Sequence, residues 1–269
     1  LHRLDLPEED SVGFKEGLTG TSAPSEDAIE VAVIDLPHIS NFTDFDPLGI
    51  EPDVCVQVIR CVEDLGEPDA IILPGSKNVM ADLAYLKKTG LDRKIRKLAE
   101  NSKTEILGIC GGFQMLGTRL DDPSGVESAP GTTMKALGLL PAATRLMTDK
   151  ILKRVEAKHT PSGFDVYGYE IHHGLTDSGN LPPCIRTEKG EIIGLTADNG
   201  RIWGTYLHGL FDADAFRRWW IDRLRLRRGW EACGKIHAVY DLEPAFERLA
   251  ATVRENVDMK AIYQIMGLK

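Results

Sequence analysis

The chain has 269 residues, of which 42% are hydrophobic, so it can bury the core of one large domain or of one domain with appendages. Its formal net charge of -9 argues against a nucleic-acid-binding protein. No apolar run reaches the roughly 18 residues that a membrane span needs, and the first residues lack the pattern of a secretory signal. We therefore expect a cytoplasmic protein with neither a nucleic-acid nor a membrane partner.

The cysteines give no candidate metal site. There are five of them, at positions 55, 61, 110, 184 and 233, with no C-x-x-C pair and no cluster with histidine at zinc-like spacing. This usage is typical of a reduced cytoplasm. Because the first residue is not methionine, we expect the sequence to be a fragment or a processed chain.

The first half of the chain alternates strands and helices. Residues 1–28 are rich in Glu, Asp, Ser, Gly and Pro and are predicted to be an acidic tail or linker. Four short, continuous apolar runs follow, with the pattern of parallel strands covered on both faces: residues 31–34, 54–59, 70–73 and 106–109. Helical periodicity appears from about residue 80 to 100 and again after Gly112. The alternation predicts an open, mostly parallel α/β sheet flanked by helices, with ligands at the carboxyl ends of its strands.

The second half has a different pattern. Its apolar segments are short, often alternating and separated by turn residues, and they lie near 137–146, 152–158, 165–172, 192–196 and 201–207. We expect an additional, more antiparallel strand region placed against the parallel sheet. Residues 29–228 are therefore predicted to form the main domain, and residues 229–269 a C-terminal helical extension.

The segment 213–228 has apolar residues at helical spacing and six arginines at other positions. The favoured interpretation is an amphipathic helix with a solvated basic face, and the alternative is a docking surface for another domain. Residues 242 to about 266 are predicted to form one or two further helices.

Cys110 is the leading candidate for a catalytic residue. It follows the apolar run Ile106–Ile109 and precedes Gly111, Gly112 and an amphipathic segment. A strand, a glycine-flanked side chain and a helix form the pattern of a nucleophile elbow, in which a tight turn lifts the nucleophile clear of the sheet. The alternative is a small buried cysteine at the end of a core strand.

A reactive thiol needs a base, and histidines end two probable strands. His172 and His173 precede Gly174, and His208 precedes Gly209. In an open α/β sheet, a histidine at either place could reach the crevice that holds Cys110. Spacing alone puts His208 only slightly ahead of His172, because histidines at strand ends also serve as plain hydrogen-bonding residues.

Acyl transfer also needs donors for the oxyanion. Gly75 follows the third apolar run, in Pro74-Gly75-Ser76, where glycine can turn its N–H toward the crevice. With the N–H of Gly111 it would form a two-donor hole, each donor lowering the barrier by about 3 kcal/mol. The alternative is an ordinary turn from a strand to a helix.

These motifs together resemble those of class I, or triad-type, glutamine amidotransferases. Their nucleophile motif is matched by Gly108-x-Cys110-x-Gly112-x-Gln114, their oxyanion strand by Pro74-Gly75, and their late histidine by His208. Within that superfamily the chain resembles the cobyric acid synthase branch, on three segments: residues 39–48, 169–172 and 204–211. The resemblance covers residues 30 to 228, and the acidic start resembles the end of an ATP-dependent synthetase domain that is otherwise absent here.

One position departs from the wider superfamily. Most members have a glutamate two residues after the histidine, whereas position 210 is leucine here, as expected for the cobyric acid synthase branch. The group that orients the imidazole must therefore come from elsewhere, and Asp212 and Glu170 are the candidates.

The resemblance implies a function for the chain. Cys110 and His208 would hydrolyse glutamine through a thioester, Gly75 and Gly111 would stabilise the oxyanion, and Gln114 would hold the substrate. The ammonia would amidate an ATP-activated corrinoid, adenosylcobyrinic acid a,c-diamide, in cobalamin biosynthesis. ATP and Mg²⁺ would belong to the synthetase domain, with no cofactor in this chain.

Other functions stay open at this point. A related amidotransferase, acting in cobyrinic acid a,c-diamide synthesis or on a cell-wall precursor, would share the elbow, although the segment 40–46 favours cobyric acid synthase. A cysteine hydrolase for esters or peptides is a further alternative. A non-catalytic interaction module is the last, and the intact Cys110, Gly111 and His208 argue against it.

Overall fold

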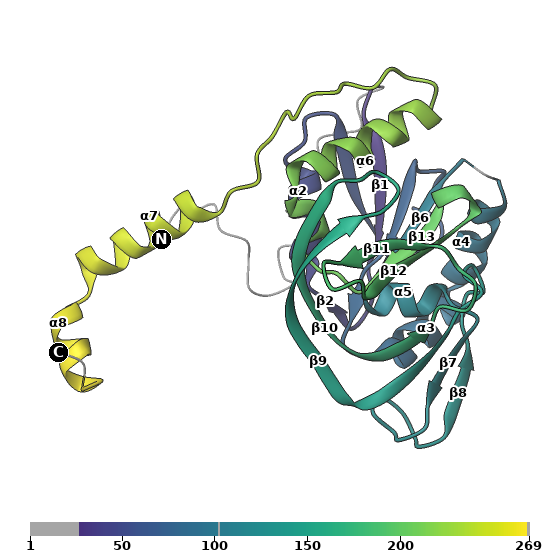
Figure 1. Ribbon diagram of the computed structural model, residues 1–269, viewed down its shortest axis with the longest axis horizontal. Helices are drawn as coiled ribbons and strands as arrows, with labels where there is room; N and C mark the ends of the chain where they lie inside the picture. Colours follow the sequence, from purple (N-terminus) through teal and green to yellow (C-terminus); the bar gives the residue numbers. More distant parts are fainter. Residues whose placement is uncertain (1–26, 102, 268–269) are drawn as a thin grey trace.

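Five parallel strands form the centre of the sheet in the computed structural model, which describes residues 27–101 and 103–267 (Figure 1). In spatial order they are β3 (Val54–Ile59), β1 (Ile29–Ile34), β4 (Ala70–Leu73), β6 (Glu105–Ile109) and β13 (Ile202–Thr205). The first four lie where the continuous apolar runs predicted them. β4 and β6 are buried along their whole length, as expected for strands covered on both faces.

Helices follow the strands as the periodicity predicted, with one difference. The periodicity from 80 to 100 belongs to two helices, α3 (Val79–Thr89) and α4 (Leu91–Glu100). Gly90 separates them with a φ of 83°, a left-handed conformation that ends a helix and that glycine adopts without steric cost. The short helix α5 (Gly111–Leu116) follows β6 and packs on β4, β6 and β13.

The predicted antiparallel region is present and extends the same sheet. β9 (Ala143–His159) and β10 (Asp165–Asp177) form a long antiparallel ribbon, seen as the broad curved arrows in Figure 1. β11 (Pro183–Thr187) and β12 (Ile192–Ala197) join this ribbon to the central strands. β13 is antiparallel to β12 but parallel to β6, so the segment 201–207 belongs to the parallel core as well.

Several smaller elements complete the sheet and its edges. β7 (Arg119–Asp122) and β8 (Thr132–Lys135) form one end of the sheet beside β9. The segment near 137–146 becomes a strand only from Ala143 onward. The remaining short elements are β2 (Ile39–Ser40), η1 (Phe42–Phe45), α2 (Asp46–Gly49), β5 (Gly75–Ser76), η2 (Asp198–Gly200) and η3 (Leu210–Asp212).

The basic face predicted for residues 213–228 is solvated only in part, because Arg227 and Arg228 are exposed but not all six arginines are. The segment forms α6 (Asp214–Arg227), but Arg217 and Arg218 are buried in it. Arg217 Nε lies 2.8 Å from Glu51 Oε1, and Arg218 Nη1 lies 2.9 Å from Asp53 Oδ1. Helical spacing could not indicate this, because the carboxylates that pair with the arginines come from a loop about 165 residues earlier.

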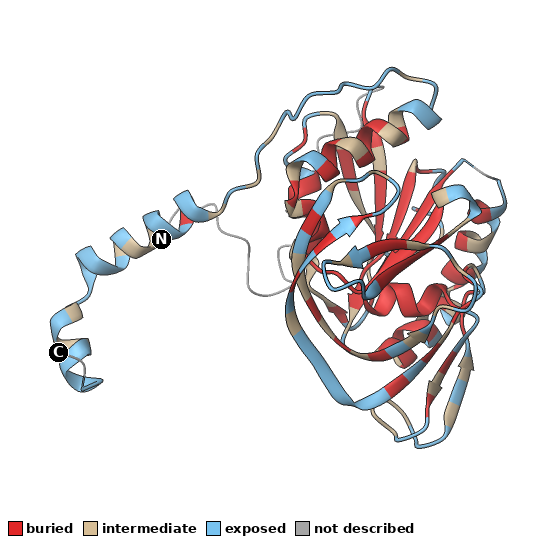
Figure 2. Cartoon of the chain, in the orientation of Figure 1, coloured by how far each residue is buried: buried red, intermediate tan, exposed pale blue. Residues whose placement is uncertain are grey.

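The end of the chain forms the two predicted helices, α7 (Glu243–Asn256) and α8 (Met259–Ile265). They stand apart from the sheet, and most of their surface is exposed (Figure 2). In the part of the chain that the structure describes, no helix is long and apolar enough to cross a membrane. The predicted acidic tail at 1–28 lies almost wholly outside the described residues.

Candidate active site

Cys110 occupies the turn between β6 and α5. Its φ of 51° and ψ of -105° place a non-glycine residue in a sparsely populated conformation, which stores strain of about 1–3 kcal/mol. The turn is tight because α5 lies directly on β4: a Cβ added at Gly112 would come within 1.9 Å of the Leu73 carbonyl oxygen. Only glycine fits there. The local geometry is therefore that of a nucleophile elbow.

His208 follows β13 at the carboxyl edge of the sheet and is fully buried. Its Nδ1 lies 2.7 Å from Oδ2 of Asp44, and its Nε2 lies 3.0 Å from Nδ2 of Asn41. Asp44 also accepts a hydrogen bond of 2.8 Å from the backbone N–H of Gly209. The carboxylate thus holds both the ring and the backbone beside it, as the third member of a catalytic triad does.

The surroundings of His208 favour its charged form. Burial by itself lowers the pKa of the ring, but the Asp44 carboxylate outweighs it, and the hydrogen-bonding Cys110 side chain adds to the effect. Together these two groups raise the pKa of His208 to about 10. The Asp44 and Cys110 side chains thus favour a protonated ring, whereas the Asn41 amide can donate to Nε2 only when that nitrogen is unprotonated.

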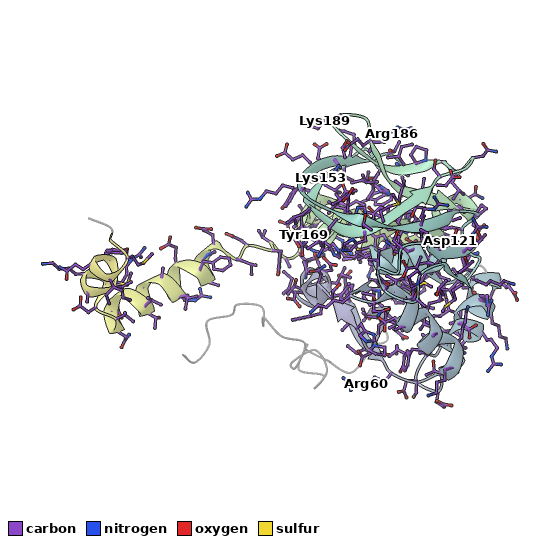
Figure 3. All side chains as sticks on the ribbon, turned by 90° about the horizontal axis from the view of Figure 1, so that it is seen from below. Arg60, Asp121, Lys153, Tyr169, Arg186 and Lys189 are labelled. Atoms are coloured by element: carbon purple, nitrogen blue, oxygen red, sulfur yellow. The ribbon has the colours of Figure 1, made fainter. Side chains whose placement is uncertain are left out.

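A second layer of contacts fixes Asn41 and the ring. The Tyr169 hydroxyl donates a hydrogen bond of 3.1 Å to Oδ1 of Asn41, and the Tyr169 ring stacks on His208 with 5.2 Å between the centroids. Tyr169 and His208 also exchange backbone hydrogen bonds, which tie β10 to the loop after β13. In Figure 3, Tyr169 lies at the edge of the strand ribbon.

His172 also reaches this region, but its ring has other partners. Nδ1 lies 2.8 Å from the Gly174 carbonyl oxygen, and Nε2 lies 3.0 Å from Oε2 of Glu170. Because both ring nitrogens face oxygen acceptors, His172 has no lone pair directed at Cys110. His208 instead interacts with the Cys110 side chain and is held by Asp44, which favours it over His172 as the base, a choice that spacing had left almost open.

Neither Glu170 nor Asp212, the two sequence candidates for the orienting group, contacts the ring nitrogens of His208. Glu170 pairs with His172 and with Lys153. Burial and, next in size, the nearby Asp44 carboxylate together raise the pKa of Asp212 to about 7. Asp44 takes the place that they were expected to fill.

A cavity of about 230 Å³ opens beside the elbow. Cys110, Gly111 and Gln114 line it, together with Ser76, Lys150 and His172 among others. Gln114 lines the cavity, and its buried Oε1 has no hydrogen-bond partner among the described residues. The cavity is large enough for a small amino acid and has polar groups at several sides.

Of the two expected oxyanion donors, Gly111 lines this cavity directly. Gly75 is paired with Ser40 in the small β2–β5 sheet, and a Cβ added to it would come within 3.0 Å of Cε1 of His208. Its neighbour Ser76 lines the cavity instead, and the backbone nitrogen of Ser76 lies next to Gly111. The strand after Pro74 thus contributes backbone at the expected place, one residue further along.

Asn41 and Asp44 are parts of the site that no sequence motif indicated. Both lie in the segment 40–46, which was informative only through its resemblance to a family. An Asn and an Asp just after a short strand are common turn residues, so residue type alone gave no reason to select them.

Comparison with known proteins supports the assignment of the fold and the family. The sequence profile of the CobB/CobQ-like glutamine amidotransferase domain matches residues 30–216. The cobyric acid synthase of Nitratidesulfovibrio vulgaris is 47% identical, and the alignment covers 100% of this chain and 56% of that protein. The cobyric acid synthase of Geobacillus thermodenitrificans is 43% identical over 99% of this chain and 53% of that protein.

Two further matches are similar. The adenosylcobalamin biosynthesis bifunctional protein CobDQ of Leptospira interrogans is 48% identical over 100% of this chain and 31% of its own length. The solved structure of PurLQS from Thermotoga maritima has a TM-score of 0.52 at 19% identity, covering 84% of this chain and 99% of that one, which shows a shared fold. The chain spans about half the length of the cobyric acid synthases it matches.

Proposed function

Because this chain belongs to the CobB/CobQ-like glutamine amidotransferase domain family, we propose that Cys110 and His208 hydrolyse glutamine in it, with Asp44 as the orienting group. The observation that supports this most is the Asp44 carboxylate, 2.7 Å from the buried His208 ring beside the elbow cysteine. A nucleophile, a base and an oriented carboxylate are the parts that acyl transfer from an amide requires.

The first half of the reaction forms a thioester. The Cys110 thiolate attacks the side-chain carbonyl carbon of glutamine, and the carbonyl electrons move to the oxygen. The backbone N–H groups of Gly111 and of Gly75 or Ser76 stabilise that oxyanion. As the oxyanion collapses, the C–N bond breaks, and the His208 imidazolium gives its proton to the departing amide nitrogen, which leaves as ammonia. The pKa of about 10 for His208 supports a proton being present for this step.

The second half releases glutamate and restores the starting state. Neutral His208, held by Asp44, takes a proton from water, and the hydroxide attacks the thioester carbonyl. The second oxyanion collapses with breakage of the C–S bond, so glutamate leaves and Cys110 is again a thiolate beside an imidazolium. Gln114, which lines the cavity beside Cys110, holds the substrate in this scheme.

The ammonia serves a second reaction in the whole protein. Because relatives named cobyric acid synthase match this chain from end to end, we assign it the amidotransferase part of such an enzyme, acting in cobalamin biosynthesis in the cytoplasm. The acceptor is the corrinoid adenosylcobyrinic acid a,c-diamide, activated by ATP and Mg²⁺ in a synthetase domain. This chain itself is assigned only the glutamine half-reaction.

Covalent labelling with the glutamine analogue 6-diazo-5-oxo-norleucine tests the site. We expect one adduct on Cys110 by intact mass and peptide mapping, none in Cys110→Ala, and slow labelling in His208→Ala. His172→Ala is the matched control, because His172 lines the same cavity without a free ring nitrogen, and it should label faster than His208→Ala.

Either of two results would contradict the proposal. An adduct that forms at the same rate without His208 would remove its role as the base. No adduct on the wild-type chain, either alone or joined to a synthetase domain, would remove glutamine as the substrate.

A further inference from the structure

The C-terminal helices carry an apolar face that nothing in the described structure packs against. The hydrophobic core cluster of the described residues ends at Leu224, with Trp230 packed against it, and Ala245 is the one buried residue of α7. Figure 3, turned by 90° from Figure 1, also shows α7 and α8 apart from the sheet, so the separation does not depend on the view. We call α7 and α8 together the helical tail.

Four apolar residues of α7 fall on one stripe at spacings of three and four: Phe246, Leu249, Ala250 and Val253. Charged residues such as Glu247 and Glu255 lie on the other side of the helix. Phe246 is 50% exposed, and in the following helix Ile265 is 86% exposed. The tail therefore has an amphipathic pattern, but its apolar face is open to solvent.

Such a face indicates a partner on physical grounds. An isolated helix of 14 residues is marginal in water, and most of its stability in a protein comes from packing of its apolar face. Contiguous exposed apolar patches on soluble proteins are typical of interaction sites.

The comparisons indicate what kind of partner this is. The amidotransferase domain profile stops at residue 216, so the amidotransferase fold does not require the tail. The alignments with cobyric acid synthases nevertheless cover 99–100% of the chain, so they include the tail, and those enzymes are about twice as long as this chain. The tail is thus shared with proteins that have a second half in addition to the amidotransferase domain.

We propose that the apolar face of the helical tail, centred on Phe246 and Val253, docks onto the synthetase half of the cobyric acid synthase polypeptide. This inference rests on the proposed function and adds to it the surface by which the two halves are joined. The helical tail joins the two halves at a surface outside the glutamine site, so glutamine hydrolysis at Cys110 does not depend on it.

Hydrogen exchange followed by mass spectrometry tests the docking. One sample is this chain alone, and the other is a full-length chimera in which the chain replaces the matching part of the Nitratidesulfovibrio vulgaris enzyme. We expect amides of residues 243–265 to exchange at least about tenfold more slowly in the chimera, which corresponds to about 1.4 kcal/mol of local stabilisation. Equal exchange in the two samples would overturn the proposal.

Two variants separate docking from general damage. Phe246→Asp in the chimera should remove the protection of the tail, whereas Ala251→Asp, which places the same charge on the opposite side of α7, should leave it. In the chain alone, neither variant should change the urea midpoint or the labelling of Cys110. If Phe246→Asp lowers the urea midpoint of the isolated chain and Ala251→Asp does not, another part of this same chain covers the apolar face. That result would contradict docking to the synthetase half.

Sedimentation velocity of the chain alone tests whether a second copy of the chain covers the apolar face of the helical tail. We expect a monomer at all concentrations, and a dimer that Phe246→Asp dissociates would overturn the proposal. Loss of Cys110 labelling with normal protection of the tail would count against the glutamine site and not against the docking, so the two proposals can fail separately.

Discussion

Oδ2 of Asp44 lies 2.7 Å from Nδ1 of His208, although the two residues are 164 positions apart in the chain. Asp44 belongs to η1, and its second oxygen accepts the N–H of Gly209, so the carboxylate joins the two ends of the domain at the site. Asp44 thus holds the His208 ring from a segment far earlier in the chain, whereas position 210, two residues after the histidine, is leucine.

Replacing Asp44 should disable the site. In Asp44→Asn the ring loses the charge that raises its pKa, and we expect labelling by the glutamine analogue and glutamine hydrolysis to fall roughly 10²–10⁴-fold. Asp212→Asn is the matched control, because Asp212 is a half-buried acidic neighbour that does not contact the ring, and it should stay within about tenfold of wild type. A larger loss in Asp212→Asn than in Asp44→Asn would show that the orienting group is misassigned.

The raised pKa of His208 should make stability depend on pH. The folded-state pKa of about 10 exceeds the ordinary 6.5, so protonation of His208 stabilises the fold fully below pH 6.5 and loses this effect as pH rises through about 10. Urea unfolding of wild type and His208→Gln across that range measures it. We expect the unfolding free energy of wild type to fall relative to that of His208→Gln as pH rises. A difference between the two that stays constant would contradict a charged His208 ring.

Asp212 should show linkage of the same sign in a lower pH range, because its folded-state pKa is also raised. Burial, with the Asp44 charge next in size, raises its pKa from 3.8 to about 7, so the folded state prefers the protonated carboxyl. Stability from that proton is present below pH 3.8 and is lost as pH rises through about 7. Asp212→Asn should therefore gain unfolding free energy relative to wild type over this range and keep the gain above it, as measured by urea titration.

Strain at the elbow should be measurable at Cys110. The φ of 51° and ψ of -105° suit glycine better than any residue with a Cβ, so Cys110→Gly should be more stable than Cys110→Ala by about 1 kcal/mol. Both variants lack the thiol, so lost chemistry does not enter the comparison. Equal urea midpoints, or a more stable alanine variant, would mean that the turn holds no such strain.

The sequence by itself determined the local elements and most of the chemistry. Continuous apolar runs placed β1, β3, β4 and β6, because strands covered on both faces must be apolar throughout. Glycine spacing around Cys110 identified the elbow, because only that pattern allows α5 to lie on β4. These features depend on residues close together in the chain, and therefore they can be predicted from periodicity and residue type.

Only the tertiary structure decided which distant residues meet. It placed Asp44 on His208, gave both ring nitrogens of His172 other partners, and buried Arg217 against Glu51. The contacts of His208 and Arg217 join segments that are far apart in the sequence. Those of His172 depend on how the β10 backbone turns its ring. An Asp, a His or an Arg has the same side chain whether it is solvated or paired, so its role is set by the groups that folding brings within hydrogen-bond distance.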